Sequence, residues 1–148
     1  MSMTPIITPA TSPTEALCHD INRLMADLTS HPRPMTIERL KGLLATPGTH
    51  LYMVSIEEEG IEPVGMFTLA VTNLPSGHNV WLEDVVVDNR HQGLGLGKLI
   101  VKQAIQKAQA LCPEGKLMLT SRPSRLAANH IYSTMLPKKE TNVYCLQL

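Results

Sequence analysis

The chain has 148 residues and a mass of 16.3 kDa, the size of one domain with a single core. Apolar residues make up 43% and charged residues 18%, a composition typical of globular rather than disordered chains. Thirteen basic residues balance thirteen acidic ones, and this neutrality disfavours a dedicated nucleic-acid binder, which needs a positive field. We therefore expect one domain over residues 1–148 and no nucleic-acid partner.

Targeting signals and cysteines bear on the compartment. No apolar run approaches the roughly 18 residues that span a bilayer, and the N-terminus lacks a basic region and an apolar signal core. Cys18, Cys112 and Cys145 are odd in number and far apart, so they predict no disulfide framework. The six histidines show no metal-ligand spacing. We expect a cytoplasmic protein without a metal and without membrane association.

The first third of the chain predicts a short strand and two helices. Residues 6–8 are β-prone. Ser12, Pro13 and Glu15 form a capping box, with Ser12 as the N-cap, and apolar residues then follow at helical spacing. A second, shorter helix is predicted to begin after a Thr36 cap.

The remainder of the chain predicts strands first and then alternating helices and strands. Strands are expected at 50–57, 64–72 and 80–87, the first two forming a hairpin around the acidic turn at 57–60. After these, the expected elements are a helix at 96–111, a strand at 116–120, a helix at 124–135 and a closing strand at 141–148. This order predicts an α/β, or α+β, domain.

A glycine-rich loop lies between the third long strand and the following helix. Gly93, Gly95 and Gly97 can adopt conformations closed to other residues, and successive amides at a helix N-terminus attract a phosphate or pyrophosphate. A P-loop does not fit, because Gln92 stands where glycine is needed. A dinucleotide fingerprint is weak, because its third glycine is missing and residues 116–120 carry no acid. A tight connection without a ligand is the remaining alternative.

Two motifs carry a family resemblance. Residues 82–88, followed by a Q/R-x-x-G-x-G/A pattern at 92–97, closely resemble the acyl-coenzyme-A-binding motif of the GNAT superfamily of N-acetyltransferases. Residues 121–132 resemble that family's later strand-to-helix motif, which supplies an asparagine and a tyrosine. The resemblance implies a mixed, mostly antiparallel sheet of about six strands flanked by about four helices, with splayed central strands.

The resemblance also implies acetyl-CoA as cosubstrate, and a place for it. The backbone of the valine run would pair with the pantetheine arm, the glycine loop would cradle the pyrophosphate, and an asparagine would contact the arm. The implied cofactor-binding residues are Val85, Val86, Val87, Gln92, Gly93, Leu94, Gly95, Leu96, Gly97, Lys98 and Asn129.

Catalytic roles follow from the same resemblance. Tyr132 would protonate the departing thiolate as general acid, and packing in the core is its alternative role. The acceptor amine must attack as a neutral group, so a base must take its proton. Glu83 is the first candidate and Asp84 the second, and both are candidates for binding the amine. Because successive strand residues face opposite sides, we expect only one of them to line the cleft.

Other features bear on the substrate and on the alternative functions. Residues 82–88 resemble glucosamine-6-phosphate N-acetyltransferases, whereas the later motif is closer to small bacterial GNAT proteins of unassigned substrate. We expect acetyl transfer by direct attack in a ternary complex, onto a primary amine of a small molecule. Leu136 and Pro137 stand where the family usually has a glycine-phenylalanine pair. This departure leaves a non-catalytic coenzyme-A-binding or sensing module as the alternative, and a homodimer as one way to cover the last strand.

Overall fold

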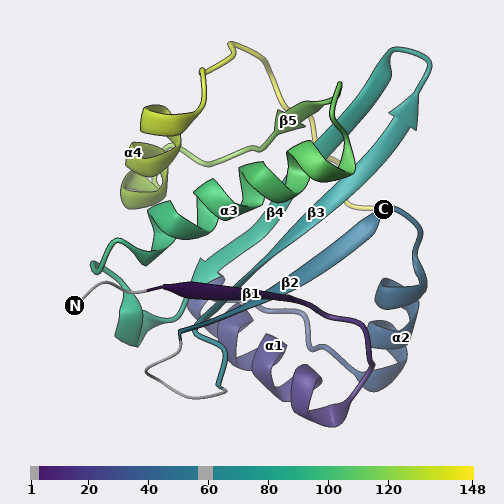
Figure 1. The fold of residues 1–148 in the computed structure, drawn as a ribbon, viewed down its shortest axis with the longest axis vertical. Coiled ribbons are helices and arrows are strands. Elements are labelled where there is room, and N and C mark those ends of the chain that lie inside the picture. The colour runs from purple at the N-terminus through teal and green to yellow at the C-terminus, as the bar shows by residue number, and fades with distance from the viewer. Residues whose placement is uncertain (1–3, 57–61) are drawn as a thin grey trace.

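The computed structural model describes residues 4–56 and 62–148, so the expected acidic turn at 57–60 lies outside the described residues. Figure 1 shows a single sheet with helices on both of its faces. The strands are β1 (Pro5–Pro9), β2 (Thr49–Ile56), β3 (Gly65–Leu74), β4 (Gly77–Val87) and β5 (Lys116–Met118). The helices are α1 (Glu15–Leu28), α2 (Ile37–Ala45), the short 3₁₀ turn η2 (Asn89–His91), α3 (Leu96–Leu111) and α4 (Leu126–Met135).

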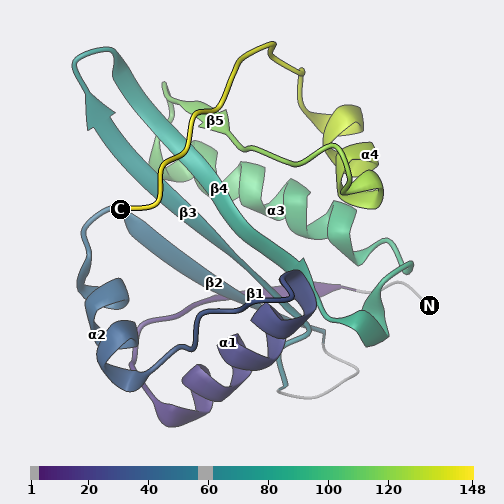
Figure 2. The same cartoon turned by 180° about the vertical axis from the view of Figure 1, so that it is seen from behind.

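The sheet follows the chain order β1-β2-β3-β4-β5. Every neighbouring pair is antiparallel except β4 and β5, which are parallel and are joined by the crossover helix α3. Helices α3 and α4 cover one face, and α1 and α2 cover the other (Figures 1 and 2). The expected α/β class with a mostly antiparallel sheet is therefore confirmed.

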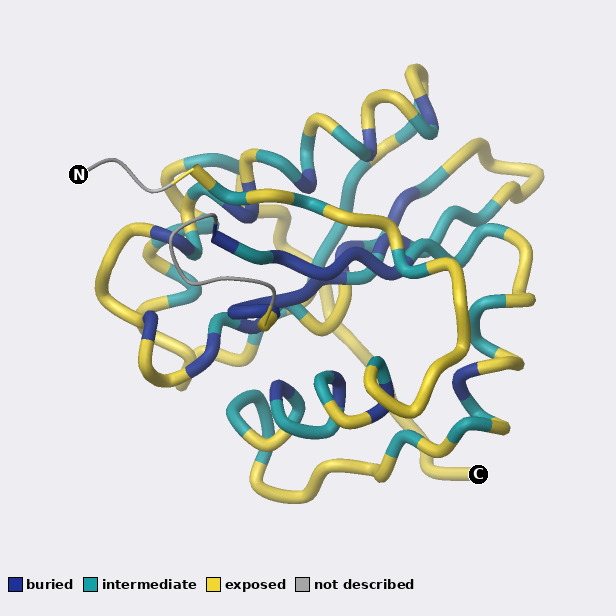
Figure 3. The backbone as a smooth tube through the Cα atoms, turned by 60° about the horizontal axis from the view of Figure 1, so that its bottom comes forward, coloured by how far each residue is buried: buried dark blue, intermediate teal, exposed yellow. Residues whose placement is uncertain are grey.

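Two apolar clusters hold these layers together. One, which includes Phe67, Leu69 and Ile100, packs the sheet against α3, and the other, which includes Leu24 and Leu40, packs it against α1 and α2. All five side chains have no exposed surface. Burying each of them contributes roughly 1.5–3 kcal/mol. Figure 3 shows the buried residues following the central strands and the inner sides of the helices.

The predicted N-cap residue is correct for α2 and wrong for α1. Thr36 caps α2 as expected, its hydroxyl accepting a hydrogen bond from the Arg39 amide at 3.2 Å. The prediction that Ser12 caps the first helix is wrong, because Thr14 takes that role and accepts from the Leu17 amide at 3.1 Å. Serine and threonine carry the same cap chemistry, so the local pattern does not separate two candidates two positions apart.

The predicted closing strand at 141–148 is wrong. Residues 137–148 form no strand, and this segment, which we call the C-terminal segment, crosses the sheet on the face that carries α1 and α2 (Figure 2). Its side chains Val143, Tyr144 and Leu146 are 68%, 89% and 81% exposed. Alternating apolar residues form a strand only beside a partner edge, and the nearest edge strand, β5, offers just three residues.

None of the helices in the described parts of the chain combines the length and the apolar character needed to cross a membrane.

Candidate active site

Strand β4 separates from its neighbour halfway along its length. It pairs with β5 over only three positions, from Asn79 opposite Lys116 to Trp81 opposite Met118. Beyond Met118 the chain turns away toward α4 (Figure 2). Residues 82–87 of β4 therefore have no paired strand on this side within the described residues, and an open strand edge offers its backbone groups to an extended ligand. The predicted splay of the central strands is confirmed.

A bulge interrupts β4 at the start of this open edge. Thr68 on β3 lies opposite Glu83, whereas Met66 lies opposite Val86, so two residues of β4 face one residue of β3. Asp84 has a φ of +50°, and it is the one residue other than glycine with a positive φ among residues 4–56 and 62–148. Such a conformation costs about 1–2 kcal/mol and is typical of functional sites.

The bulge also decides which residues face which helices. Leu82, before it, and Val85 and Val87, after it, all pack in the cluster against α3. Alternation along the strand therefore directs Glu83 to the opposite face, and Asp84 is the extra residue that resets the alternation. The two neighbouring acids thus differ in their placement.

The carboxyl groups of these two acids have shifted pKa values. Partial burial raises the pKa of Glu83, and the neighbouring charge of Asp84 raises it further. Partial burial also raises the pKa of Asp84. Both residues keep much of their surface exposed. A carboxylate with a raised pKa is a stronger proton acceptor, which is what a general base requires.

The loop between β4 and α3 is shaped by two left-handed glycines. Gly93 and Gly95 both have a φ of +80°, and a Cβ atom at either would meet no atom within 4 Å. Backbone conformation rather than space therefore requires glycine here. Gly95 is the N-cap of α3 and supplies no side-chain bond, so no cap side chain occupies the first amides of the helix.

The third glycine of the motif has a different structural role. Gly97 lies inside α3, and a Cβ atom there would come within 3.1 Å of the Ile131 side chain on α4. Glycine at this position therefore allows α4 to lie close against the start of α3. Its predicted contact with a cofactor remains a prediction.

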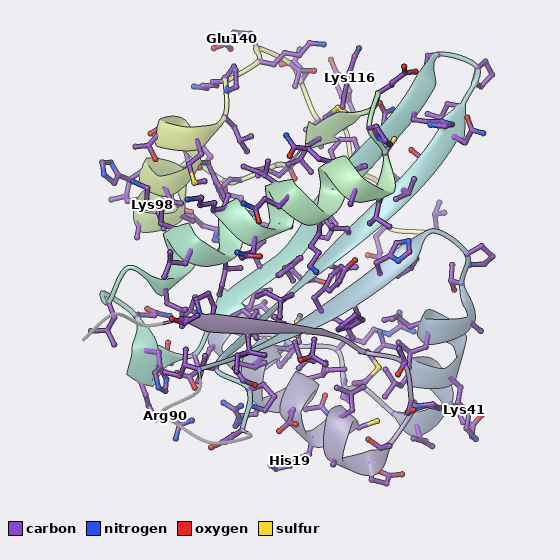
Figure 4. The ribbon with its side chains drawn as sticks, viewed as in Figure 1. His19, Lys41, Arg90, Lys98, Lys116 and Glu140 are labelled. Atoms are coloured by element: carbon purple, nitrogen blue, oxygen red, sulfur yellow. The ribbon has the colours of Figure 1, made fainter. Side chains whose placement is uncertain are left out.

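The other predicted loop residues differ in exposure. Gln92, Leu94 and Lys98 are exposed, whereas the side chain of Leu96 is buried in the core cluster against α3. Figure 4 shows Arg90 and Lys98 on the same side of the molecule, at the end where β4 leads into α3. The Arg90 guanidinium pairs with Asp88 and Glu62, so Lys98 is the cation that adds positive charge beside the first amides of α3.

Helix α4 carries the predicted asparagine and tyrosine one turn apart. The side-chain amide nitrogen of Asn129 donates a hydrogen bond to the Arg122 carbonyl at 2.8 Å. This bond holds the segment that leads into the helix. Tyr132 is half-buried, and burial raises the pKa of its hydroxyl, an effect that the positive charge of Arg125 opposes. A tyrosine with a raised pKa keeps its proton and can serve as a donor.

A buried polar cluster next to the loop was not predicted. Asp88 follows β4 and is 1% exposed, and its carboxylate lies 2.5 Å from His91 Nδ1 and 3.0 Å from Arg90 Nη2. Arg23, 65 residues earlier on α1, approaches the same carboxylate at 3.4 Å. The spacing from Asp88 to His91 suits a local cap, but nothing local indicates the partner on α1.

Within the described residues, no group of three or more histidine, cysteine, aspartate or glutamate side chains is placed to hold a metal ion. Cys18 and Cys112 are buried, Cys145 is exposed, and all three are free thiols.

Comparison with known proteins defines the family. The model of the Acetyltransferase (GNAT) family matches residues 16–135, which include the open edge of β4, the glycine loop and α4. The chain therefore belongs to the GNAT family of acetyltransferases. The comparison with curated protein sequences finds no match.

Solved structures share the fold over nearly the whole chain. A protein from Agrobacterium tumefaciens str. C58, named as an acetyltransferase, is 22% identical with a TM-score of 0.79, over 96% of this chain and 99% of that one. The ribosomal-protein-alanine N-acetyltransferase from Brucella melitensis biovar Abortus 2308 is 16% identical with a TM-score of 0.75, over 98% and 99%. Glucosamine-6-phosphate N-acetyltransferase from Arabidopsis thaliana is 18% identical with a TM-score of 0.68, over 97% and 99%. At these identities the likeness concerns the fold.

Proposed function

We propose that this GNAT protein transfers the acetyl group of acetyl-CoA to a primary amine of a small molecule. One observation carries the proposal. The unpaired edge of β4 leads directly into a loop with two left-handed glycines and an α3 N-terminus without a side-chain cap. An extended amide-bearing arm that ends in a diphosphate is the kind of ligand that these two features suit together.

The residues present fit acetyl-CoA, which would supply an activated acetyl thioester. The backbone of Val85, Val86 and Val87 would bind the pantetheine amides along the open edge. Amides between Gly93 and Lys98 would bind the pyrophosphate, since neither positive-φ glycine places a side chain over them. Exposed Lys98 adds positive charge at this end of the molecule (Figure 4).

The chain's own acids and tyrosine would move the protons. Glu83, or Asp84 in its place, would take the proton that the amine nitrogen releases as its bond to the acetyl carbon forms. Tyr132 would donate its hydroxyl proton to the sulfur as the carbon–sulfur bond breaks. The raised pKa values support this division, because Tyr132 keeps its proton for donation and the ionised carboxylates of the two acids become stronger proton acceptors.

The proposed acceptor is a small molecule rather than a nucleic acid. Zero formal net charge gives the chain no overall positive field of the kind that supports RNA binding. Among proteins of similar fold, the names cover both glucosamine-6-phosphate and the alanine of a ribosomal protein, so fold alone does not choose between small molecules and protein N-termini.

Calorimetry and a thiol-release assay test the proposal together. We expect acetyl-CoA to bind with measurable heat, and thiol release to depend on at least one member of a panel of small primary amines. Peptides with free N-termini serve as the competing panel. Turnover on the peptides alone would show that the acceptor is a protein N-terminus and not a small molecule. Binding without turnover on either panel would favour the sensing module, and the absence of binding would overturn the proposal.

We also propose that the C-terminal segment contributes to a homodimer. Its apolar residues Val143, Tyr144 and Leu146 are largely exposed, and β5 is an edge strand of only three residues. Pairing of this segment with β5 of a second copy would cover both. Light scattering at micromolar concentration should give twice the monomer mass for the wild type. The double variant Tyr144→Ser with Leu146→Ser should give the mass of one monomer. A monomeric mass for the wild type would exclude the dimer.

A further inference from the structure

Helix α1 reaches the glycine loop through two side chains one turn apart. Arg23 approaches Asp88, and its guanidinium also pairs with Glu62 at 3.2 Å and donates to the Pro63 carbonyl. Asp27, four residues later on the same face of α1, lies against the loop itself. The helix is therefore joined to the segment that follows β4 at two points.

Asp27 holds the first residue of η2 with both of its carboxylate oxygens. Oδ2 accepts a hydrogen bond from the Asn89 backbone amide at 3.0 Å, and Oδ1 accepts one from the Asn89 side-chain amide at 2.8 Å. Hydrogen bonds to an ionised acceptor are roughly twice as strong as neutral ones. The paired geometry fixes both the backbone and the side chain of Asn89.

The contact continues from Asn89 toward the glycines. The Asn89 side-chain oxygen accepts a hydrogen bond from Gln92 Nε2 at 3.1 Å, and the same nitrogen donates to the Val87 carbonyl at 3.1 Å. Gln92 directly precedes Gly93, so a chain of side-chain bonds runs from α1 to the first left-handed glycine. These bonds fix residues 87–92, the segment that leads directly into the positive-φ glycines Gly93 and Gly95.

We infer that Asp27 is a positioning residue for acetyl-CoA: by holding Asn89, it orders the loop whose amides would bind the pyrophosphate. This inference rests on the proposed function. A loop already held in its binding conformation loses less conformational entropy when the ligand binds, so the gain is in affinity. Asp27 itself need not touch the ligand.

Two thioesters separate positioning from a general structural effect. Acetyl-CoA carries the pyrophosphate, whereas S-acetylpantetheine has the same reacting thioester and lacks it. For Asp27→Ala we expect the KM for acetyl-CoA to rise about tenfold, equivalent to about 1.4 kcal/mol. The kcat with acetyl-CoA and the kcat/KM with S-acetylpantetheine should stay within about twofold of the wild type, because the thioester site is unchanged.

Matched variants on the same helix control the experiment. Asp20→Ala removes a carboxylate two turns earlier in α1, where the described residues show no hydrogen bond to the loop, and should leave both thioesters unaffected. Asp27→Asn keeps one carbonyl oxygen as an acceptor and should fall between Asp27→Ala and the wild type. Asn89→Ala removes the side-chain bond to Asp27 and the bond to Gln92, so its effect combined with Asp27→Ala should be smaller than the sum of the two single effects.

The outcomes distinguish this inference from the proposed function. If the wild type binds acetyl-CoA and Asp27→Ala binds it equally well, Asp27 has no positioning role and the proposed function stands. If Asp27→Ala weakens both thioesters by the same factor, its effect is general and the inference fails. If the wild type fails to bind acetyl-CoA, the proposed function itself fails.

Discussion

The two motif-bearing regions of the molecule, the loop between β4 and α3 and the helix α4, are supported in different ways. The loop is tied by side chains from its own turn and from α1, with the fully buried Asp88 at the centre of the cluster. Helix α4 has no buried residue, and no side chain caps its N-terminus. Its contact with the rest of the fold includes Ile131 against Gly97 of α3.

This difference separates binding from chemistry. The region that would hold the cofactor is ordered before any ligand arrives, at the expense of a buried carboxylate and two left-handed glycines. The region that carries the proposed acid is lightly packed, and little of the fold's stability depends on it. Changes in the loop should therefore affect affinity and stability, whereas changes in α4 should affect turnover.

The largest expected effect is on the α4 side. Tyr132→Phe removes one hydroxyl, and kcat should fall by about 10²–10⁴-fold because the departing thiolate loses its proton donor. The Kd for acetyl-CoA and the melting temperature should hardly change. Steady-state kinetics, calorimetry and thermal unfolding measure the three quantities.

Tyr144→Phe is the matched control, because Tyr144 is 89% exposed and lies in the C-terminal segment. The same hydroxyl is removed without touching α4, so kcat should be unchanged. Wild-type turnover of Tyr132→Phe would show that Tyr132 is not the general acid. A large loss of stability in this variant would show that α4 supports the fold as the loop does.

A second test concerns the two acids at the bulge. For the base, kcat/KM should rise with pH through the raised pKa of its carboxyl group, because only the ionised form accepts a proton. Glu83→Gln should lower kcat by about 10²-fold and remove this limb of the profile. Asp84→Asn, which keeps a residue that tolerates the left-handed φ, should have the smaller effect. The reverse ranking would make Asp84 the base.

Much of this arrangement was predictable from local sequence. Helix α3 begins and ends at the predicted residues, since left-handed glycines precede it and the chain reverses at 113–115. The hairpin of β2 and β3 also follows the prediction. These features depend on periodicity and turn chemistry, which neighbouring residues determine.

The features that sequence reasoning missed depend on distant partners. The bond between Arg23 and Asp88 joins residues 65 positions apart, and the bond between Asp27 and Asn89 joins residues 62 apart. The C-terminal segment shows the opposite error: its alternating pattern is typical of a strand, but a strand also needs a free edge with enough hydrogen-bonding positions. Local patterns do not report whether such partners are in reach.

The acid stability of the fold tests the loop side. Burial alone would raise the pKa of Asp88, but hydrogen bonds from His91 and Arg90, together with their charges, outweigh it and lower the pKa. A folded-state pKa below the unfolded value means that the carboxylate stabilises the fold above about pH 4, and that this stabilisation is lost as the pH falls further.

Urea unfolding of the wild type and Asp88→Asn between pH 3 and pH 7 measures this contribution. At pH 7 the variant should be less stable by about 3 kcal/mol, because the cations around Asp88 lose their buried partner. The difference should shrink below about pH 4, where the wild-type carboxylate takes up its proton. A difference that stays constant across this range would mean that the charge of Asp88 does not matter.

The smallest effect, and the sharpest contrast, concerns two glycines with positive φ. Gly95→Ala forces alanine into the left-handed region at a cost of about 1–2 kcal/mol, and Gly77→Ala, at a φ of +129°, forces it into a region that is still less accessible to alanine. At neither position would the new Cβ meet an atom within 4 Å. Both variants should therefore lose stability in urea unfolding, Gly77→Ala at least as much as Gly95→Ala. Only Gly95→Ala should also weaken acetyl-CoA binding, by about tenfold, equivalent to about 1.4 kcal/mol, because only Gly95 sets the first amides of α3. Equal affinities for the two variants would show that the left-handed turn at α3 serves the fold alone, and the pyrophosphate would then have to bind elsewhere.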